Sequence, residues 1–196
     1  MGKIKSALEI ALERTESVKS DKGSIGQFEA RQKGKKLAND FLAGSIKSLE
    51  EEINKTAKDE QENLRQGVFD ILITRISLPN TKEEIQLIEA AGKGLLAVIK
   101  DKRFGEVVKE LPKIMNQYSQ EAAQYEAAIK QQYAPKLRQK EEEIARRLGR
   151  EVKLDPFQDP EFVAFFNQHM NALKSNYQAV LDDIREEATR LFGEKN

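Results

Sequence analysis

The C-terminal stretch from Asp159 to Gly193 constrains the fold more than any other part of this sequence. Asp159 can cap the free amides of a first helical turn, and Pro160 follows at the position where its missing N–H costs nothing. Apolar residues then recur at alternating spacings of three and four, which predicts one amphipathic helix with a single buried stripe. The stripe contains Phe162, Phe166, Met170, Leu173, Tyr177, Val180, Ile184, Ala188 and Leu191.

A helix of this length spans roughly 50 Å and is stable only when its apolar face packs on partners of similar length. The rest of the chain repeats the same period, and we predict further helices over 3–19, 27–42, 45–77, 82–101 and 106–148. Breaks are expected at 20–26, 43–44, 78–80 and 104–105, where Gly, Pro and small polar residues gather. A strand over 68–78 is the alternative for the end of the third segment, because that stretch is rich in Ile and Val.

Three local features refine these helices. Pro112 and Pro135 fall inside 106–148; Pro135 is expected to bend a continuing helix, and Pro112 either interrupts it or stands in its first turn. Gly92 and Gly94 lie in a run of small residues, which predicts the close approach of another helix. The nine residues 150–158 are long enough for the last helix to fold back antiparallel.

The expected fold is therefore all-α: an elongated, largely antiparallel, coiled-coil-like bundle of five to six helices. We expect one helical domain over 1–196. In the alternative arrangement, residues 1–44 form an N-terminal helical hairpin that is loosely attached to the rest. The apolar fraction of 39% and the charged fraction of 34% suit helices with thin cores and large solvated faces.

The composition excludes several chemistries. Lys and Arg number 33 and Asp and Glu number 33, so no global field attracts nucleic acid or an anionic membrane. The absence of Cys excludes disulfides and thiolate catalysis, and the single histidine, His169, lies beside the apolar stripe, with Phe166 where a di-iron helix would carry Glu. We expect no catalytic residue, metal or cofactor. With no transmembrane run and no secretory pattern, the cytoplasm is the expected location.

Two groups of residues are candidates for an interaction surface. Tyr118, Tyr125 and Tyr133 fall seven and eight residues apart on one predicted helix face, where they either pack into the core or form a recognition row. A basic cluster in the second helix either forms a solvated face or binds anionic lipid or nucleic acid; it consists of Arg31, Lys33, Lys35 and Lys36.

These features favour a non-enzymatic protein-interaction, scaffold or assembly protein that acts through long amphipathic helix faces. Its partner would be another protein or a second copy of the chain in a homodimer. The alternative is a peripheral lipid- or nucleic-acid-binding protein that uses the basic N-terminal helices, with nucleic acid disfavoured by the zero net charge. A third hypothesis is an enzyme that uses carboxylates with Lys or Tyr in a cleft between helices.

Overall fold

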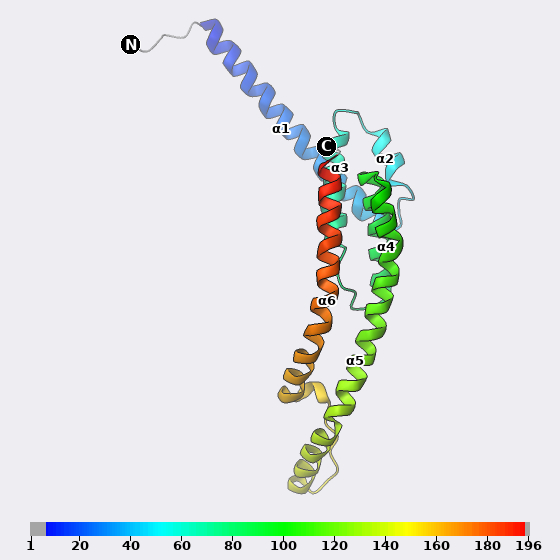
Figure 1. Ribbon diagram of the computed structural model, residues 1–196. Coiled ribbons are helices and arrows are strands. Elements are labelled where there is room, and N and C mark those ends of the chain that lie inside the picture. The colour runs from blue at the N-terminus through cyan, green and yellow to red at the C-terminus, as the bar shows by residue number, and fades with distance from the viewer. Residues whose placement is uncertain (1–6, 195–196) are drawn as a thin grey trace, which may run out of the picture. The chain divides into compact units, whose positions relative to one another are not determined.

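The computed structural model describes the backbone of residues 7–194 and the side chains of residues 24–194. This part of the chain contains six α-helices, one short 3-10 turn and no strand (Figure 1), so the all-α prediction is confirmed and the strand alternative for 68–78 is wrong. The elements are α1 (Ala7–Leu42), α2 (Leu49–Lys55), α3 (Gln61–Thr74), α4 (Lys82–Ile99), α5 (Lys102–Leu148), η1 (Pro156–Gln158) and α6 (Pro160–Gly193).

The chain divides into two compact units, each built from separate segments. Unit 1 comprises Met1–Ile76, Ala90–Gly105 and Ala188–Asn196, and unit 2 comprises Ser77–Glu89 and Glu106–Glu187. The prediction of a single domain over 1–196 stays a prediction.

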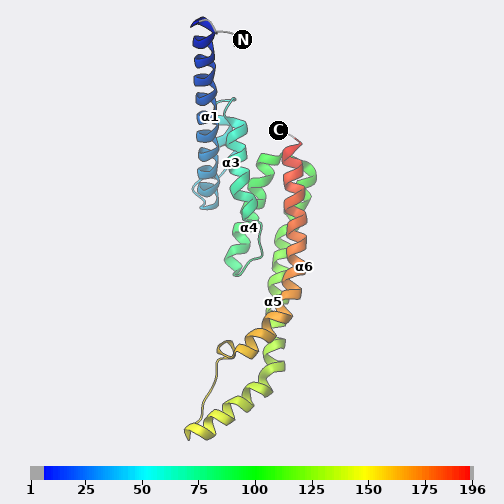
Figure 2. The ribbon, with the colours of Figure 1, turned by 90° about the vertical axis from the view of Figure 1, so that its left-hand side faces the viewer.

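In unit 1, α1 and α3 pack so closely that their backbones touch (Figure 2). A Cβ atom added to Gly34 of α1 would lie 2.0 Å from the carbonyl oxygen of Leu64, and one added to Gly67 of α3 would lie 2.0 Å from that of Arg31. Only glycine permits such an approach. Arg31 also bonds Asp70 at 2.7 Å. Because residue 31 meets residue 70 while residue 34 meets residues 64 and 67, the two helices run antiparallel.

Buried side chains of α3 form the centre of the core of unit 1. Leu72 is fully buried, and a Cβ on Gly94 of α4 would meet its side chain at 2.6 Å, which confirms the predicted close approach at this small-residue run. Phe69 stacks on Phe192 of α6 with ring centroids 4.3 Å apart. The other large side chains buried here are Leu49, Ile53, Ile76, Leu95, Ile99, Phe104 and Leu191.

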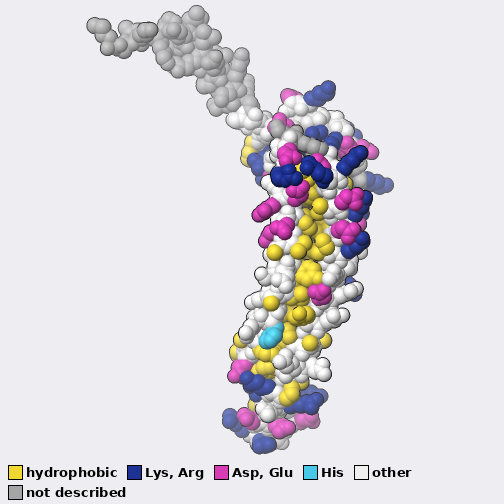
Figure 3. All heavy atoms as spheres, in the orientation of Figure 1, with side chains coloured by type: hydrophobic (Ala, Val, Ile, Leu, Met, Phe, Trp, Pro, Cys, Tyr) yellow, Lys and Arg dark blue, Asp and Glu magenta, His cyan; other side chains and the backbone are white. Residues whose placement is uncertain are grey.

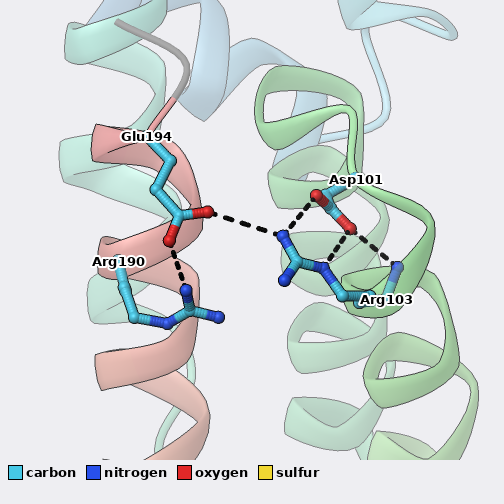
Figure 4. A network of polar contacts seen from close by, with 4 residues as sticks. All are labelled: Asp101, Arg103, Arg190 and Glu194. Atoms are coloured by element: carbon cyan, nitrogen blue, oxygen red, sulfur yellow. Dashed lines mark hydrogen bonds and ion pairs between the residues drawn. The ribbon is translucent and has the colours of Figure 1, made fainter.

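A polar network in unit 1 links the junction between α4 and α5 to the end of α6 (Figure 4). Asp101 caps α5 by accepting from the Arg103 backbone N–H at 2.8 Å, and it also accepts from the Arg103 guanidinium. Arg103 reaches Glu194 at 3.5 Å, and Glu194 pairs with Arg190 near the end of α6. The chain turns at Lys100, which has a φ of 54°. The predicted break at 104–105 is therefore wrong, since both residues lie inside α5.

The predicted turn at 20–26 is also wrong. The helix α1 runs through it, so residues 7–42 form one helix and no hairpin, while residues 3–6 of the predicted first helix lie outside the described residues. A glycine inside a helix costs only about 1 kcal/mol relative to Ala, so Gly23 and Gly26 need not end one.

The single helix predicted over 45–77 is two helices. Ser48 caps α2 by accepting from the backbone N–H of Glu51, and α2 ends where Thr56 adopts an extended conformation with a ψ of 150°. The break falls where the apolar stripe thins over 58–63. A polar segment has no buried face to hold it in a helix.

In unit 2, α5 and α6 lie side by side and run antiparallel, since Tyr118 contacts Tyr177 while Tyr133 contacts Phe162. The helix α6 begins at Pro160 behind the cap at Asp159, as predicted. Pro112 and Pro135 both lie inside α5, which ends before Gly149 with its φ of 67°. One core cluster of this unit consists of Tyr118, Ile129, Tyr133, Phe162, Met170 and Leu173, and Leu111, Met115 and Leu181 are also fully buried.

Candidate functional site

An apolar groove of about 480 Å³ lies between α5 and α6 of unit 2. Its floor consists of Val107 and Ile114 from α5 and of Val180 and Ile184 from α6. Val180 is 40% exposed, although it belongs to the predicted buried stripe, whereas Leu173 and Ile184 in the same stripe are 6% and 8% exposed. The stripe is therefore covered on both sides of Val180 and open at it.

Carboxylates line both walls of the groove. Glu106 and Glu110 stand on α5, and Asp183 and Glu187 stand on α6, so each wall carries two acidic side chains four residues apart. That spacing places the members of each pair one turn apart on the same helix face. Figure 3 shows apolar side chains in a row between the two helices, with acidic side chains on both sides. No basic side chain occurs among the described residues that line the groove.

The carboxylates on α5 are only weakly engaged by their own helix. Glu106 pairs with Lys109 at 2.7 Å, and Glu110 pairs with Lys113 at 2.7 Å, all four side chains being more than half exposed. Exposed pairs of this kind contribute about 0–1 kcal/mol to stability. A cation from a binding partner can therefore replace these lysines at little cost.

The register of the two helices creates the groove. On α5, Leu111 and Met115 are buried, whereas Val107 and Ile114 stand at the edge of that face and are half-buried. The antiparallel pairing of α5 and α6 then sets residues 107–114 beside residues 180–187. Apolar residues from both helices form the floor, and charged residues at the next edge positions form the walls.

A second polar cluster in unit 2 holds the start of α6 against α5. The Asp159 carboxylate accepts from the Tyr133 hydroxyl at 2.9 Å, from the Lys140 ammonium at 2.8 Å and from the Glu161 backbone N–H at 3.1 Å. Lys140 also bonds Glu161. The hydrogen bond from Lys140 lowers the pKa of Asp159 and outweighs burial, which raises it. Burial, together with the bond to Asp159, raises the pKa of the Tyr133 hydroxyl.

The bonds within this cluster explain why these polar residues lie together, because each of its polar groups has a partner in the cluster and holds α6 against α5. The sequence indicated Asp159 only as a cap. The seven-residue spacing of Tyr133 and Lys140, which places both on one face of α5, is the signal that could have revealed the rest.

The three tyrosines do not form one exposed row. Tyr118 and Tyr133 are each 6% exposed in the core of unit 2, and Tyr125 between them is 48% exposed. Two of the three therefore pack in the core, and a recognition role for Tyr125 stays a prediction.

The basic cluster of α1 is partly neutralised within unit 1. Arg31 pairs with Asp70 of α3 at 2.7 Å, and Lys33 pairs at 3.5 Å with Glu60, the residue directly before α3. Lys36 is exposed and Lys35 half-buried. The prediction that this cluster binds an anionic partner stays a prediction.

His169 has a local partner, since its Nδ1 lies 2.7 Å from the carbonyl oxygen of Phe165 and its ring stacks obliquely on that residue. Within residues 24–194 no three His, Cys, Asp or Glu side chains stand close enough to hold a metal ion. None of the described helices is long and apolar enough to cross a membrane.

Comparison with known proteins gives one match. No curated protein and no solved structure matches the chain. A family model matches residues 50–190, a region that contains both walls of the groove and excludes α1. Because that match covers most of the sequence, the chain belongs to the family described as a family of unknown function, DUF6657.

Proposed function

We propose that this chain is a non-enzymatic interaction protein that holds an amphipathic helix of a partner protein in the groove between α5 and α6. The observation that supports the proposal is an open apolar floor, centred on Val180, with two carboxylates on each wall. A groove between two helices is a common receptor for the apolar face of a third helix.

The charges define the chemistry of the partner. Its helix carries a row of apolar residues at spacings of three and four, which enters the groove and covers Val180. Lys or Arg residues flank the row on both sides, because they meet Glu106 and Glu110 on one wall and Asp183 and Glu187 on the other. A partner with acidic flanks is rejected by like-charge repulsion.

A designed peptide tests this proposal. A helical peptide of about 18 residues, long enough to be helical in isolation, carries Leu in a three–four row with Lys on both flanks. A matched peptide has Glu in place of every Lys. Fluorescence anisotropy should show saturable binding of the Lys peptide that weakens as salt screens the charges, and no binding of the Glu peptide.

Two protein variants locate the binding site. Val180→Asp places a charge on the apolar floor and should abolish binding of the Lys peptide. Leu148→Asp makes the same kind of change at a residue that is 57% exposed near the end of α5, outside the groove, and should leave binding unchanged. Equal binding of both peptides, or equal binding by Val180→Asp and the unmodified protein, would refute the proposal.

A second copy of the chain is the other occupant to test. Light scattering should show a monomer over a wide range of concentrations if a partner protein fills the groove. A dimer that Val180→Asp dissociates would instead identify the occupant as another copy. The cytoplasmic location and the alternative of lipid or nucleic-acid binding through α1 stay predictions.

A further inference from the structure

Tyr118 is a buried residue of unit 2 whose hydroxyl has no partner among the described residues there. The residue is 6% exposed, packs edge-on against Tyr177 with ring centroids 5.2 Å apart, and makes no hydrogen bond within the described part of the chain. A buried tyrosine hydroxyl usually finds a partner. By contrast, the equally buried Tyr133 donates to Asp159.

This hydroxyl is not sealed from solvent. Among side chains of residues 24–194, the only nitrogen or oxygen atom that is both sealed and without a partner is Nε of Arg65. The Tyr118 hydroxyl therefore reaches open space, and Tyr118 lines a pocket of about 360 Å³. That volume lies at the lower end of the range of about 300–1,000 Å³ that is typical of small-molecule sites.

Three segments of unit 2 form this pocket, which we call the Tyr118 pocket. The residues before α4 and its first residue, Lys82, contribute one side, and α5 and α6 contribute the others. Ala122, Phe166 and Met170 line it with apolar side chains, and the polar residues Asn80, Thr81 and Ser119 line it together with Tyr118. A pocket with an apolar part and a few polar groups is suited to a ligand that has both characters.

The charges at the pocket favour an anion. Lys82 and Lys174 line it, and neither ammonium group lies within ion-pair distance of a carboxylate in the described residues. Glu126 is the one acidic residue in the lining, and Lys130 already neutralises it at 2.6 Å. The amides at the start of α4 are not the basis of the site, because Glu84 turns back to the backbone N–H of Asn80 at 2.7 Å.

We propose that the Tyr118 pocket binds a small organic carboxylate with an apolar body. The carboxylate accepts a hydrogen bond from the Tyr118 hydroxyl and pairs with Lys82 and Lys174. The apolar body packs on Ala122, Phe166 and Met170. The Tyr118 hydroxyl is protonated at neutral pH and able to donate, as an ordinary tyrosine hydroxyl is, and burial raises its pKa further. This site is separate from the groove centred on Val180 and does not depend on the function proposed for it.

The test uses 4-phenylbutyrate as the probe and its neutral amide as the matched comparison, with the full-length protein and isothermal titration calorimetry. The probe should bind with one-to-one stoichiometry and a dissociation constant in the millimolar range or below. The amide should bind at least about fivefold more weakly, since it lacks the charge that the lysines recognise.

Conservative variants assign the binding to the pocket. Tyr118→Phe removes only the hydroxyl and should weaken the probe about threefold or more, and Lys174→Met should weaken it about fivefold or more. Tyr125→Phe and Lys109→Met make the same changes on α5 outside the pocket and should leave affinity unchanged. Circular dichroism verifies that each variant is folded. No binding at millimolar probe, equal binding of the amide, or equal affinity of Tyr118→Phe and Tyr125→Phe would each overturn the inference.

Discussion

The close contact between α1 and α3 leads us to expect that a single added methyl group at this contact lowers the stability of unit 1. We expect Gly34→Ala to destabilise unit 1, because the new Cβ would lie 2.0 Å from the carbonyl oxygen of Leu64 and 2.9 Å from its carbonyl carbon. Carbon and oxygen atoms normally approach no closer than about 3.3 Å. The obstacle is backbone, so no side-chain rotation can relieve it and the two helices must separate.

The expected magnitude follows from two opposing effects. Overpacking a tight contact costs about 1–3 kcal/mol, and a backbone obstacle places this site at the upper end or beyond. The better helix propensity of Ala returns about 1 kcal/mol. We therefore expect Gly34→Ala to lower the free energy of unfolding by at least about 2 kcal/mol. Gly67→Ala should behave similarly, because its Cβ would lie 2.0 Å from the carbonyl oxygen of Arg31.

The same helix provides the control. Gly26 has no atom within 4 Å of an added Cβ, so Gly26→Ala gains the propensity without the clash. Urea unfolding followed by far-UV circular dichroism should show Gly26→Ala unchanged or up to about 1 kcal/mol more stable than the unmodified protein. If Gly34→Ala and Gly26→Ala proved equally stable, the backbone contact between α1 and α3 would be refuted.

Two further changes test the polar clusters. Asp159→Asn keeps the cap but removes the charge that Lys140 pairs with, so we expect a loss of about 1–3 kcal/mol at neutral pH. Because the folded protein lowers the pKa of Asp159, its stabilisation is complete above about pH 4 and disappears as pH falls through the lowered pKa. The unfolding curves of the two proteins should therefore converge in acid, and a constant difference would contradict this account. Arg103→Gln should leave the melting temperature close to that of the unmodified protein, since the side chain that bonds Asp101 and Glu194 is 61% exposed. A clearly lower melting temperature would show that the network matters more than its exposure implies.

The sequence predicted helix ends correctly where capping residues mark them locally. The Asp159–Pro160 start of α6 and the positive-φ Gly149 after α5 both stand where the sequence places them. Pro135 lies inside a continuing helix, as the strong helix formers on both sides of it predict. In these cases the physical cause lies within a few residues of its effect. Pro112 neither interrupts the helix nor stands in its first turn, because α5 begins at Lys102.

The incorrect predictions concern regions whose structure depends on packing between segments that are distant in the sequence. Residues 20–26 resemble a turn by composition, yet they continue a helix whose later part packs on α3. The break between α2 and α3 lies beside the polar stretch over 58–63, so here a local signal was present but was given less weight than the apolar residues on both sides of it. The closest helix contact in unit 1, between Gly34 and Gly67, joins residues far apart in the chain and left no local pattern.

The groove shows the same division between local and distant causes. The stripe through Val180 could be read from the sequence, but its exposure could not, because that depends on which residues of α5 face it. The carboxylate walls likewise become a pair only once the antiparallel register brings Glu106 and Glu110 opposite Asp183 and Glu187.

Methyl NMR spectroscopy with the Lys-flanked peptide tests the central claim most directly. The four floor residues Val107, Ile114, Val180 and Ile184 all carry methyl groups that report on their surroundings. The proposed function predicts that these four sets of resonances shift on addition of the peptide, while those of Val68 in the core of unit 1 do not. Shifts that spare the four floor residues, or equal shifts with the Glu-flanked peptide, would contradict it.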